Sequence, residues 1–216
     1  MKNGAEKKIH RAMTVAYPVG AGLYINLTNK CSNRCEFCIR NNGDGAYGSD
    51  SLWLEHEPCE KEVMDAVLSF DLSEFSEVVF CGYGEPSCRL DLAVSVAKKI
   101  KAAYPSVKTR INTNGQSDLI LGYNTAPMYR GAFDTVSISL NAPSREKYQS
   151  ICHSVYGCEA FDAILRFAGN VKCEVECTVF SVVKESMSDC ELEECRNLAC
   201  SLGIPLRVRE YIGPDN

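Results

Sequence analysis

Strand-like and helix-like segments alternate along most of the chain, and this order limits the fold more than any other feature of the sequence. Between the strand-like segments, apolar residues recur at helical spacing, for example at Ala93, Val96, Ala97 and Ile100. Such long crossovers join parallel strands, because a short hairpin cannot. We therefore predict one α/β domain with a parallel sheet over residues 17–216, after an N-terminal tail over residues 1–16. The expected strands are 22–28, 76–82, 107–114, 133–141, 172–180 and 205–212, and the expected helices are 60–70, 90–104, 161–168 and 189–202, with room for only a short helix after Asn114.

Within the predicted strands, apolar and polar residues alternate, as in Val136-Ser137-Ile138-Ser139. A parallel sheet that is covered on both faces usually shows continuous hydrophobic runs instead. If the apolar set faces the helices, the polar set faces inward, and each unsatisfied buried group would cost about 1–3 kcal/mol. The inward face would then line a cavity for a polar ligand. A two-layer sheet with one face in water would give the same alternation, so this pattern alone does not choose between the two.

Three cysteines, Cys31, Cys35 and Cys38, directly follow the first predicted strand, at the end where parallel barrels place their active sites. Thiols this close together cannot all pair with one another, but they can bind one soft metal centre. Structural zinc sites favour two separated knuckles, and a second one is missing. A 4Fe–4S cluster held by three cysteines would keep one iron open. The spacing favours the cluster, with zinc and incidental thiols as alternatives.

Composition argues against several functional classes. The net charge of −5 argues against a nucleic-acid partner, and no apolar run approaches the length of a membrane span. The thirteen cysteines are an odd number, in a chain with long apolar strands, which argues against a secreted disulfide scaffold. A weakly apolar run over residues 12–25 resembles a signal peptide but continues directly into the first strand. We expect a cytoplasmic protein.

The segment Cys31-Ser32-Asn33-Arg34-Cys35-Glu36-Phe37-Cys38 resembles the signature CxxxCxφC of the radical S-adenosylmethionine (SAM) superfamily, with Phe37 as the aromatic residue. The segment Cys81-Gly82-Tyr83-Gly84-Glu85-Pro86 is similar to the glycine-rich GGEP-type motif of that superfamily. The resemblance runs from about Tyr17 onward and implies a partial (β/α)6 barrel in a single domain. Residues 26–58 resemble most closely the TatD-associated radical SAM subgroup.

The resemblance implies that Cys31, Cys35 and Cys38 bind a 4Fe–4S cluster and that SAM chelates its open iron. Reductive cleavage of SAM would give a 5′-deoxyadenosyl radical, which abstracts hydrogen from a substrate. Phe37 is expected beside the adenine, and Gly82, Tyr83, Gly84 and Glu85 around the methionyl amine. Inward side chains at the strand ends are expected to meet the ribose and carboxylate of SAM: Ser139, Asn141, Asn112, Asn114 and Thr178.

The functions of the inward charged residues stay open. Arg110 and Arg209 can pair with a carboxylate of SAM or of the substrate, or can compensate Glu174 and Glu176 inside the barrel. The two glutamates are also candidate substrate contacts.

The resemblance implies a small-molecule or peptide substrate and a low-potential flavodoxin or ferredoxin as electron donor. Two alternatives remain. One is an activase that installs a glycyl radical in a partner protein, and the other is a non-catalytic iron–sulfur or zinc protein.

Overall fold

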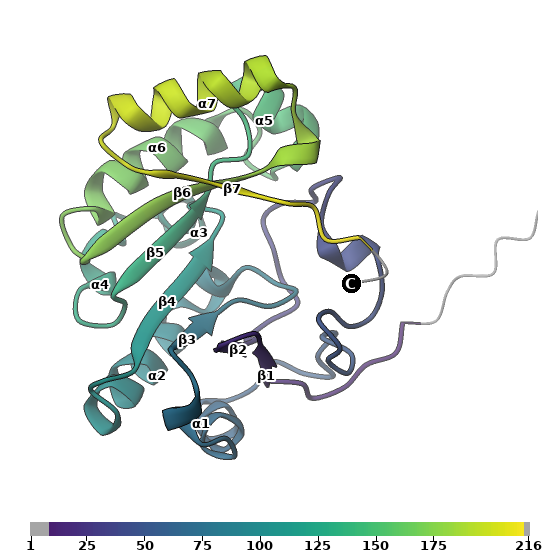
Figure 1. Cartoon of the computed structure of the whole chain (residues 1–216), viewed down its shortest axis with the longest axis vertical. Helices are drawn as coiled ribbons and strands as arrows, with labels where there is room; N and C mark the ends of the chain where they lie inside the picture. Colours follow the sequence, from purple (N-terminus) through teal and green to yellow (C-terminus); the bar gives the residue numbers. More distant parts are fainter. Residues whose placement is uncertain (1–8, 214–216) are drawn as a thin grey trace, which may run out of the picture.

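The computed structural model describes residues 9–213, which form one curved sheet with helices on its outer face (Figure 1). Seven strands lie side by side in sequence order. Only β1 is antiparallel, to β2, and every later pair is parallel. This arrangement confirms the predicted single-domain α/β fold with a partial barrel. The strands are β1 (Ala16–Val19), β2 (Gly22–Ile25), β3 (Glu77–Phe80), β4 (Lys108–Thr113), β5 (Thr135–Ser139), β6 (Cys177–Val183) and β7 (Leu206–Arg209).

Seven α-helices connect and cover the strands. They are α1 (Glu60–Leu68), α2 (Leu90–Ala103), α3 (Ser117–Leu121), α4 (Ala126–Tyr129), α5 (Arg145–Cys152), α6 (Glu159–Val171) and α7 (Asp189–Ser201). The predicted apolar face of α2 is fully buried against the sheet, as its helical spacing requires. Helix α5 was not expected from the sequence. None of the helices in residues 9–213 has the length and apolar character needed to cross a membrane.

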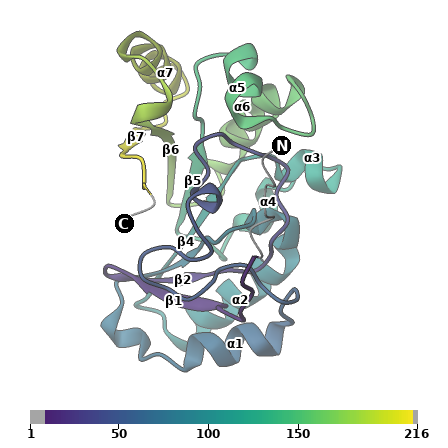
Figure 2. The same cartoon turned by 90° about the vertical axis from the view of Figure 1, so that its right-hand side faces the viewer.

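The long connection from β2 to α1 crosses the open side of the barrel, as Figure 2 shows. This connection begins with the cysteine motif. The chain before β1 also packs on it, because Ala12 N donates to Trp53 O at 2.9 Å and Val15 is only 4% exposed. The predicted boundary between tail and domain, at Tyr17, thus falls inside β1, and residues 1–8 of the tail lie outside the described residues.

Strand β1 is absent from the sequence prediction, which began the sheet at Gly22. It joins β2 through a two-residue turn at Gly20 and Ala21, and Gly20 adopts a positive φ of 56°. Glycine favours that backbone region, and such turns are typical of hairpins. Pro18 has no N–H donor, which is tolerated here because β1 is an edge strand.

Strand β6 begins later than predicted, at Cys177 instead of Lys172. Helix α6 continues to the fully buried Val171, and the next residues form the turn that follows it. Hydrogen-bonded pairing of β6 with its neighbour β5 can begin only where β5 begins. The first residue of β5, Thr135, is paired with Cys177. The alternation over residues 173–179 therefore predicted the wrong strand limits.

The true limits also reverse the inward face expected for β6. Thr178 shares a face with Phe180 and Val182, which are buried in the core under the helices. The inward positions belong to Ser181 and Val183 instead. The prediction that Thr178 points inward is wrong. The predicted strand began too early and included an acidic turn, and the alternation in that turn assigned the wrong side chains to the inward face.

Candidate functional site

A cavity of about 520 Å³ opens at the carboxyl ends of the parallel strands. Its size falls in the range of roughly 300–1,000 Å³ that is typical of ligand sites. The inward polar alternation therefore marks a cavity and not a water-covered sheet face. All the predicted site residues except Thr178 line it: Cys31, Cys35, Phe37, Cys38, Gly82, Tyr83, Gly84, Glu85, Asn112, Asn114, Ser139 and Asn141.

The cysteine loop is held in place by buried polar side chains to which the motif assigns no function. Asn33, between the first two cysteines, donates from Nδ2 to Tyr148 Oη and accepts at Oδ1 from Gln116 Nε2, both at 2.8 Å. Asn114 Nδ2 donates to Ser32 Oγ at 2.8 Å. These partners lie 82 to 115 residues away in the sequence, so no local pattern could have indicated them. Asn114 thus braces the loop as well as lining the cavity.

Helix α5 supports the same loop through its backbone. Arg34 N donates to Cys152 O at 2.9 Å and Glu36 N donates to Ile151 O at 3.0 Å. The Cys152 thiol is fully buried and hydrogen bonded to Cys35, but it does not line the cavity. The three motif cysteines therefore line the cavity, together with Cys81 at the end of β3, whereas Cys152 does not.

The donor chemistry of the three thiols fits an iron–sulfur cluster better than a single ion. Among residues 9–213, no three or more His, Cys, Asp or Glu side chains are arranged around a single metal-ion position. A zinc ion would need every sulfur at about 2.3 Å from one point, whereas each cysteine of a 4Fe–4S cluster can bind a different iron.

The surroundings raise the pKa of all three thiols above the usual value for cysteine. Burial, reinforced by the Glu85 carboxylate, raises the pKa of Cys31 to about 12. Burial also raises the pKa of Cys38, and the hydrogen bond with Cys152, followed by burial, raises that of Cys35. Thiolates are the ligating form, so the positive charge of a bound metal must stabilise them here.

The glycines of the second motif are required by chain packing. A Cβ at Gly82 would lie 2.2 Å from Asn26 Oδ1, and one at Gly84 would lie 2.1 Å from the Thr28 carbonyl oxygen. The sequence argument had explained these glycines by the close approach of a ligand. The structure adds a different reason: the chain after β3 packs directly on the chain after β2, and both segments line the cavity.

Glu85 joins the ends of β3 and β4. Its carboxylate accepts hydrogen bonds from Thr113 Oγ1 and Asn114 N, each at 2.7 Å, and from Ser87 N at 3.0 Å. Burial raises the pKa of Glu85, although these hydrogen bonds oppose the increase. The side chain thus has a structural task in addition to the ligand contact implied by the motif.

Tyr83 anchors the long loop that follows the cysteines. Its hydroxyl donates to Gly43 O at 2.9 Å, and its ring meets Trp53 edge-on at a centroid distance of 5.2 Å. Arg40 lies over the Trp53 ring at 4.9 Å and donates to the Tyr83 carbonyl at 3.2 Å. This cluster fixes the loop against the chain after β3.

Two of the predicted amides lack a partner for their oxygen atoms. Asn112 Oδ1 and Asn141 Oδ1 are both buried without a hydrogen-bond donor among the described residues. An unsatisfied buried acceptor is costly, so a ligand donor in the cavity would stabilise both. The structure also brings in lining residues that were not singled out from the sequence: Tyr24, Tyr47, Ser137, Ser181 and Tyr211.

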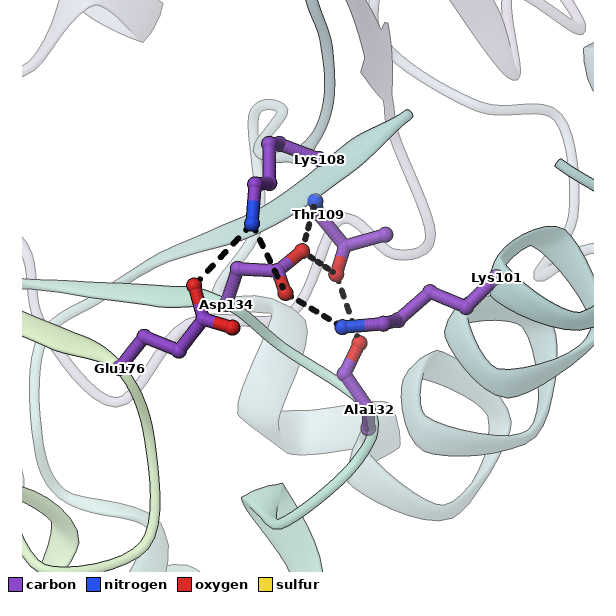
Figure 3. Close-up of polar contacts among 6 residues, drawn as sticks. All are labelled: Lys101, Lys108, Thr109, Ala132, Asp134 and Glu176. Atoms are coloured by element: carbon purple, nitrogen blue, oxygen red, sulfur yellow. Dashed lines mark hydrogen bonds and ion pairs between the residues drawn. The ribbon is translucent and has the colours of Figure 1, made fainter. Parts of the chain in front are cut away.

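Arg110 and Arg209 line the cavity, but the two glutamates do not. Glu174 pairs with Arg130 at 2.6 Å. Glu176 pairs with Lys108 at 3.1 Å beside Asp134, at the amino ends of the strands (Figure 3). The hypothesis that the arginines compensate these glutamates inside the barrel is wrong, and so is the idea that the glutamates contact a substrate in it.

A family model described as the Radical SAM superfamily matches residues 25–199, which include both motifs. The match covers well over half of the chain. The chain belongs to the Radical SAM superfamily. It is thus a radical SAM enzyme, as the motifs indicated.

Curated relatives of this radical SAM enzyme include two proteins named GTP 3′,8-cyclase. The one from Lactiplantibacillus plantarum is 27% identical over 127 residues, covering 59% of this chain and 35% of the relative. The one from Aquifex aeolicus is 26% identical over 191 residues, covering 88% of this chain and 56% of the relative. The enzyme thus spans only part of these relatives. Their names give the predicted TatD-associated subgroup no support.

Solved structures share the fold of the radical SAM enzyme at low sequence identity. Streptococcus suis SuiB bound to the precursor peptide SuiA superposes with a TM-score of 0.64 at 18% identity, covering 89% of this chain and 39% of SuiB. Methylornithine synthase (PylB) superposes with a TM-score of 0.61 at 12% identity, covering 89% of this chain and 53% of PylB. At these identities the likeness concerns the fold alone.

Proposed function

We propose that the enzyme binds one 4Fe–4S cluster through Cys31, Cys35 and Cys38 and cleaves SAM reductively. With SAM bound, the reduced cluster would supply the electron that releases methionine and a 5′-deoxyadenosyl radical, which takes hydrogen from a substrate. One observation carries the proposal: the three motif thiols line the same cavity as the strand-end polar residues. The superfamily match supports it.

In this proposal, the chain's own residues bind and orient SAM. The unpartnered Oδ1 atoms of Asn112 and Asn141 accept hydrogen bonds from its amine or hydroxyl groups. Phe37 offers an apolar surface to the adenine, and the backbone at Gly82 and Gly84 approaches the methionyl end. The rigid frame around Glu85 keeps these groups in position, which lowers the cost of ordering them on binding.

Among the alternatives, a structural zinc site fits the thiol arrangement less well, because zinc needs its ligands around one point and the described chain places no three such side chains in that way. A glycyl-radical activase would use the same cluster and SAM chemistry and would differ only in its substrate, a partner protein. We propose a small-molecule or peptide substrate taken up at the open side of the barrel. A low-potential flavodoxin or ferredoxin is the proposed electron donor.

The names of the relatives suggest a nucleotide as one candidate substrate. The chain covers only 35% of one GTP 3′,8-cyclase and 56% of the other. Residues that those proteins place outside the shared region could hold their substrate, so the cyclase activity is a narrower proposal than SAM cleavage. Turnover of GTP by the reconstituted enzyme would test it directly.

The central test is anaerobic reconstitution with iron and sulfide, followed by dithionite and SAM. We expect about four irons per chain and release of 5′-deoxyadenosine. Cys35→Ala should lose both. Cys190→Ala, at an exposed position on α7, is the matched control and should retain both. The proposal fails if the wild-type protein takes up zinc but no iron, or if Cys35→Ala cleaves SAM as fast as the wild type.

A further inference from the structure

Arg209 is the last residue of β7 and projects into the cavity from the edge of the sheet opposite β1. Its neighbour across the ladder is Val183, which offers no charge. The chain beyond β7 is tied to the loop after the cysteines, because Asn42 Nδ2 donates to Ile212 O at 2.6 Å. Arg209 therefore has a fixed backbone position beside the site.

Within the described part of the chain, the guanidinium of Arg209 has no acidic partner. It forms no ion pair with any of residues 9–213, and its Nε is buried without a hydrogen-bond acceptor. Burial lowers the pKa of Arg209, with a further decrease from Arg207, whereas the Cys81 thiol and the hydroxyls of Tyr47 and Tyr24 oppose the decrease. Arg209 is half-buried, and a partly buried charge without an acidic partner favours an anion that comes from outside the chain.

Arg110 lines the same cavity but is already compensated. Its side chain is 12% exposed, and Nη2 pairs with Glu77 at 2.7 Å. It also donates to Tyr24 Oη at 3.4 Å. Both arginines have a buried Nε without an acceptor among the described residues, but they differ in charge pairing: Arg110 pairs with Glu77, whereas Arg209 pairs with no acidic residue among residues 9–213.

Arg209 comes from a different strand than the proposed SAM contacts, at the other edge of the cavity lining in the strand order. Those contacts come from the cysteine loop and the ends of β3, β4 and β5, and Ser139 is level with Ser181 and Arg207 in the ladder. Arg209 lies two residues farther toward the carboxyl end of β7. Tyrosines 24, 47 and 211 line the cavity as well and offer rings or hydroxyls for the rest of a bound molecule.

We propose that Arg209 forms an anion subsite at the β7 edge of the cavity and binds the carboxylate or phosphate of the substrate. Guanidinium groups match both anions with two parallel hydrogen bonds. The statement that the anion belongs to a substrate rests on the proposed function, but anion binding at Arg209 can be tested without turnover. It makes Arg209 a specificity-determining residue: neutral molecules should bind poorly.

The experiment measures binding of two probe anions, pyrophosphate and malonate, to the reconstituted full chain by titration calorimetry. Arg209→Gln should weaken binding of the preferred anion by about tenfold or more, as expected for a lost hydrogen bond to a charged group. Arg209→Lys should recover part of the affinity, because it keeps the charge but not the planar fork. Arg166→Gln, on the exposed side of α6, is the matched control and should bind like the wild type.

Each outcome of the titrations either supports or overturns the proposed anion subsite. Preference for pyrophosphate supports a phosphorylated substrate, and preference for malonate supports a carboxylate. No binding of either anion, or equal losses in Arg209→Gln and Arg166→Gln, overturns the subsite. Binding should persist in saturating SAM, and displacement by SAM would assign Arg209 to the SAM carboxylate and overturn the proposal. Failure to release 5′-deoxyadenosine would refute the proposed function, but the anion-binding results could still be interpreted, because they do not depend on SAM cleavage.

Discussion

The two ends of the barrel are built on opposite principles. At the amino ends of the strands, Asp134 is nearly buried and accepts hydrogen bonds from Thr109 N at 2.7 Å and from Lys101 (Figure 3). At the carboxyl ends, Asn112, Asn141 and Arg209 keep buried polar atoms without partners. The Asp134 carboxylate is thus satisfied by the chain itself, whereas the polar atoms at the second end are available to a ligand. Parallel barrels commonly divide stability and activity between their ends in this way.

The largest expected effect comes from breaking the frame of the carboxyl end with Gly84→Ala. The new Cβ would lie 2.1 Å from the Thr28 carbonyl oxygen, and backbone cannot move away easily. We expect the free energy of unfolding to fall by about 3 kcal/mol or more, with loss of the cluster. Urea denaturation and iron content measure both.

Gly169→Ala is the matched control for this substitution. Gly169 lies in α6 with nothing within 4 Å of the added Cβ. Alanine is the better helix former, so this variant should gain about 0.5–1 kcal/mol. If both variants unfold at the same urea concentration, the backbone around Gly84 can move to accommodate the added Cβ, and the prediction is wrong.

Asp134→Asn tests the amino end. The variant loses the ion pair with Lys101 and weakens the hydrogen bonds from Thr109, so we expect a loss of about 1–3 kcal/mol in the free energy of unfolding. Iron content and SAM cleavage per folded molecule should not change, because this carboxylate does not line the cavity. A loss of the cluster from fully folded Asp134→Asn protein would contradict the separation of stability and activity between the two ends of the barrel.

The contribution of Asp134 should also depend on pH. Burial raises the pKa of this carboxyl, but hydrogen bonds from Lys101 and Thr109 outweigh burial and leave the pKa below its usual value. Its stabilising effect is therefore complete above the pKa of the unfolded chain and is lost as pH falls through the lower folded pKa. The gap in unfolding free energy between wild type and Asp134→Asn should shrink from about pH 5 to about pH 3. A constant gap would contradict this assignment.

Asn112→Leu should give the converse result at the carboxyl end. Replacing an amide whose oxygen has no partner by an apolar group of similar shape should change the unfolding free energy by about 1 kcal/mol or less. The affinity for SAM should fall by about tenfold, since one ligand hydrogen bond is removed. Calorimetric titration with SAM measures this, and unchanged affinity would remove Asn112 from the proposed contacts.

The smallest effect is expected for Thr178→Val. Thr178 faces the helix layer with its Oγ1 buried and unpartnered, so valine should leave stability unchanged or raise it by about 1 kcal/mol. SAM binding should stay the same. A clear loss of SAM affinity would show that β6 presents the face that its sequence pattern had suggested.

Most of the site was accessible to sequence reasoning because its chemistry is local. The cysteine spacing lies within eight residues, and the polar positions of β4 and β5 follow directly from strand periodicity. The errors arose where a boundary depended on a distant partner. The start of β6 is set by the start of β5, and Pro18 is tolerated because β1 is an edge strand.

The sequence by itself determined the superfamily, the parallel α/β order and the three thiols, because each depends on residue types at short spacing. Only the tertiary structure decided which charges remain free. Arg110 and Arg209 are alike in the sequence, but one meets Glu77 and the other meets no acidic group in the described chain. Glu174 and Glu176 are in an alternating run but end in ion pairs outside the cavity. Charge pairing depends on distances through space, and these are set only when strands far apart in the sequence come together.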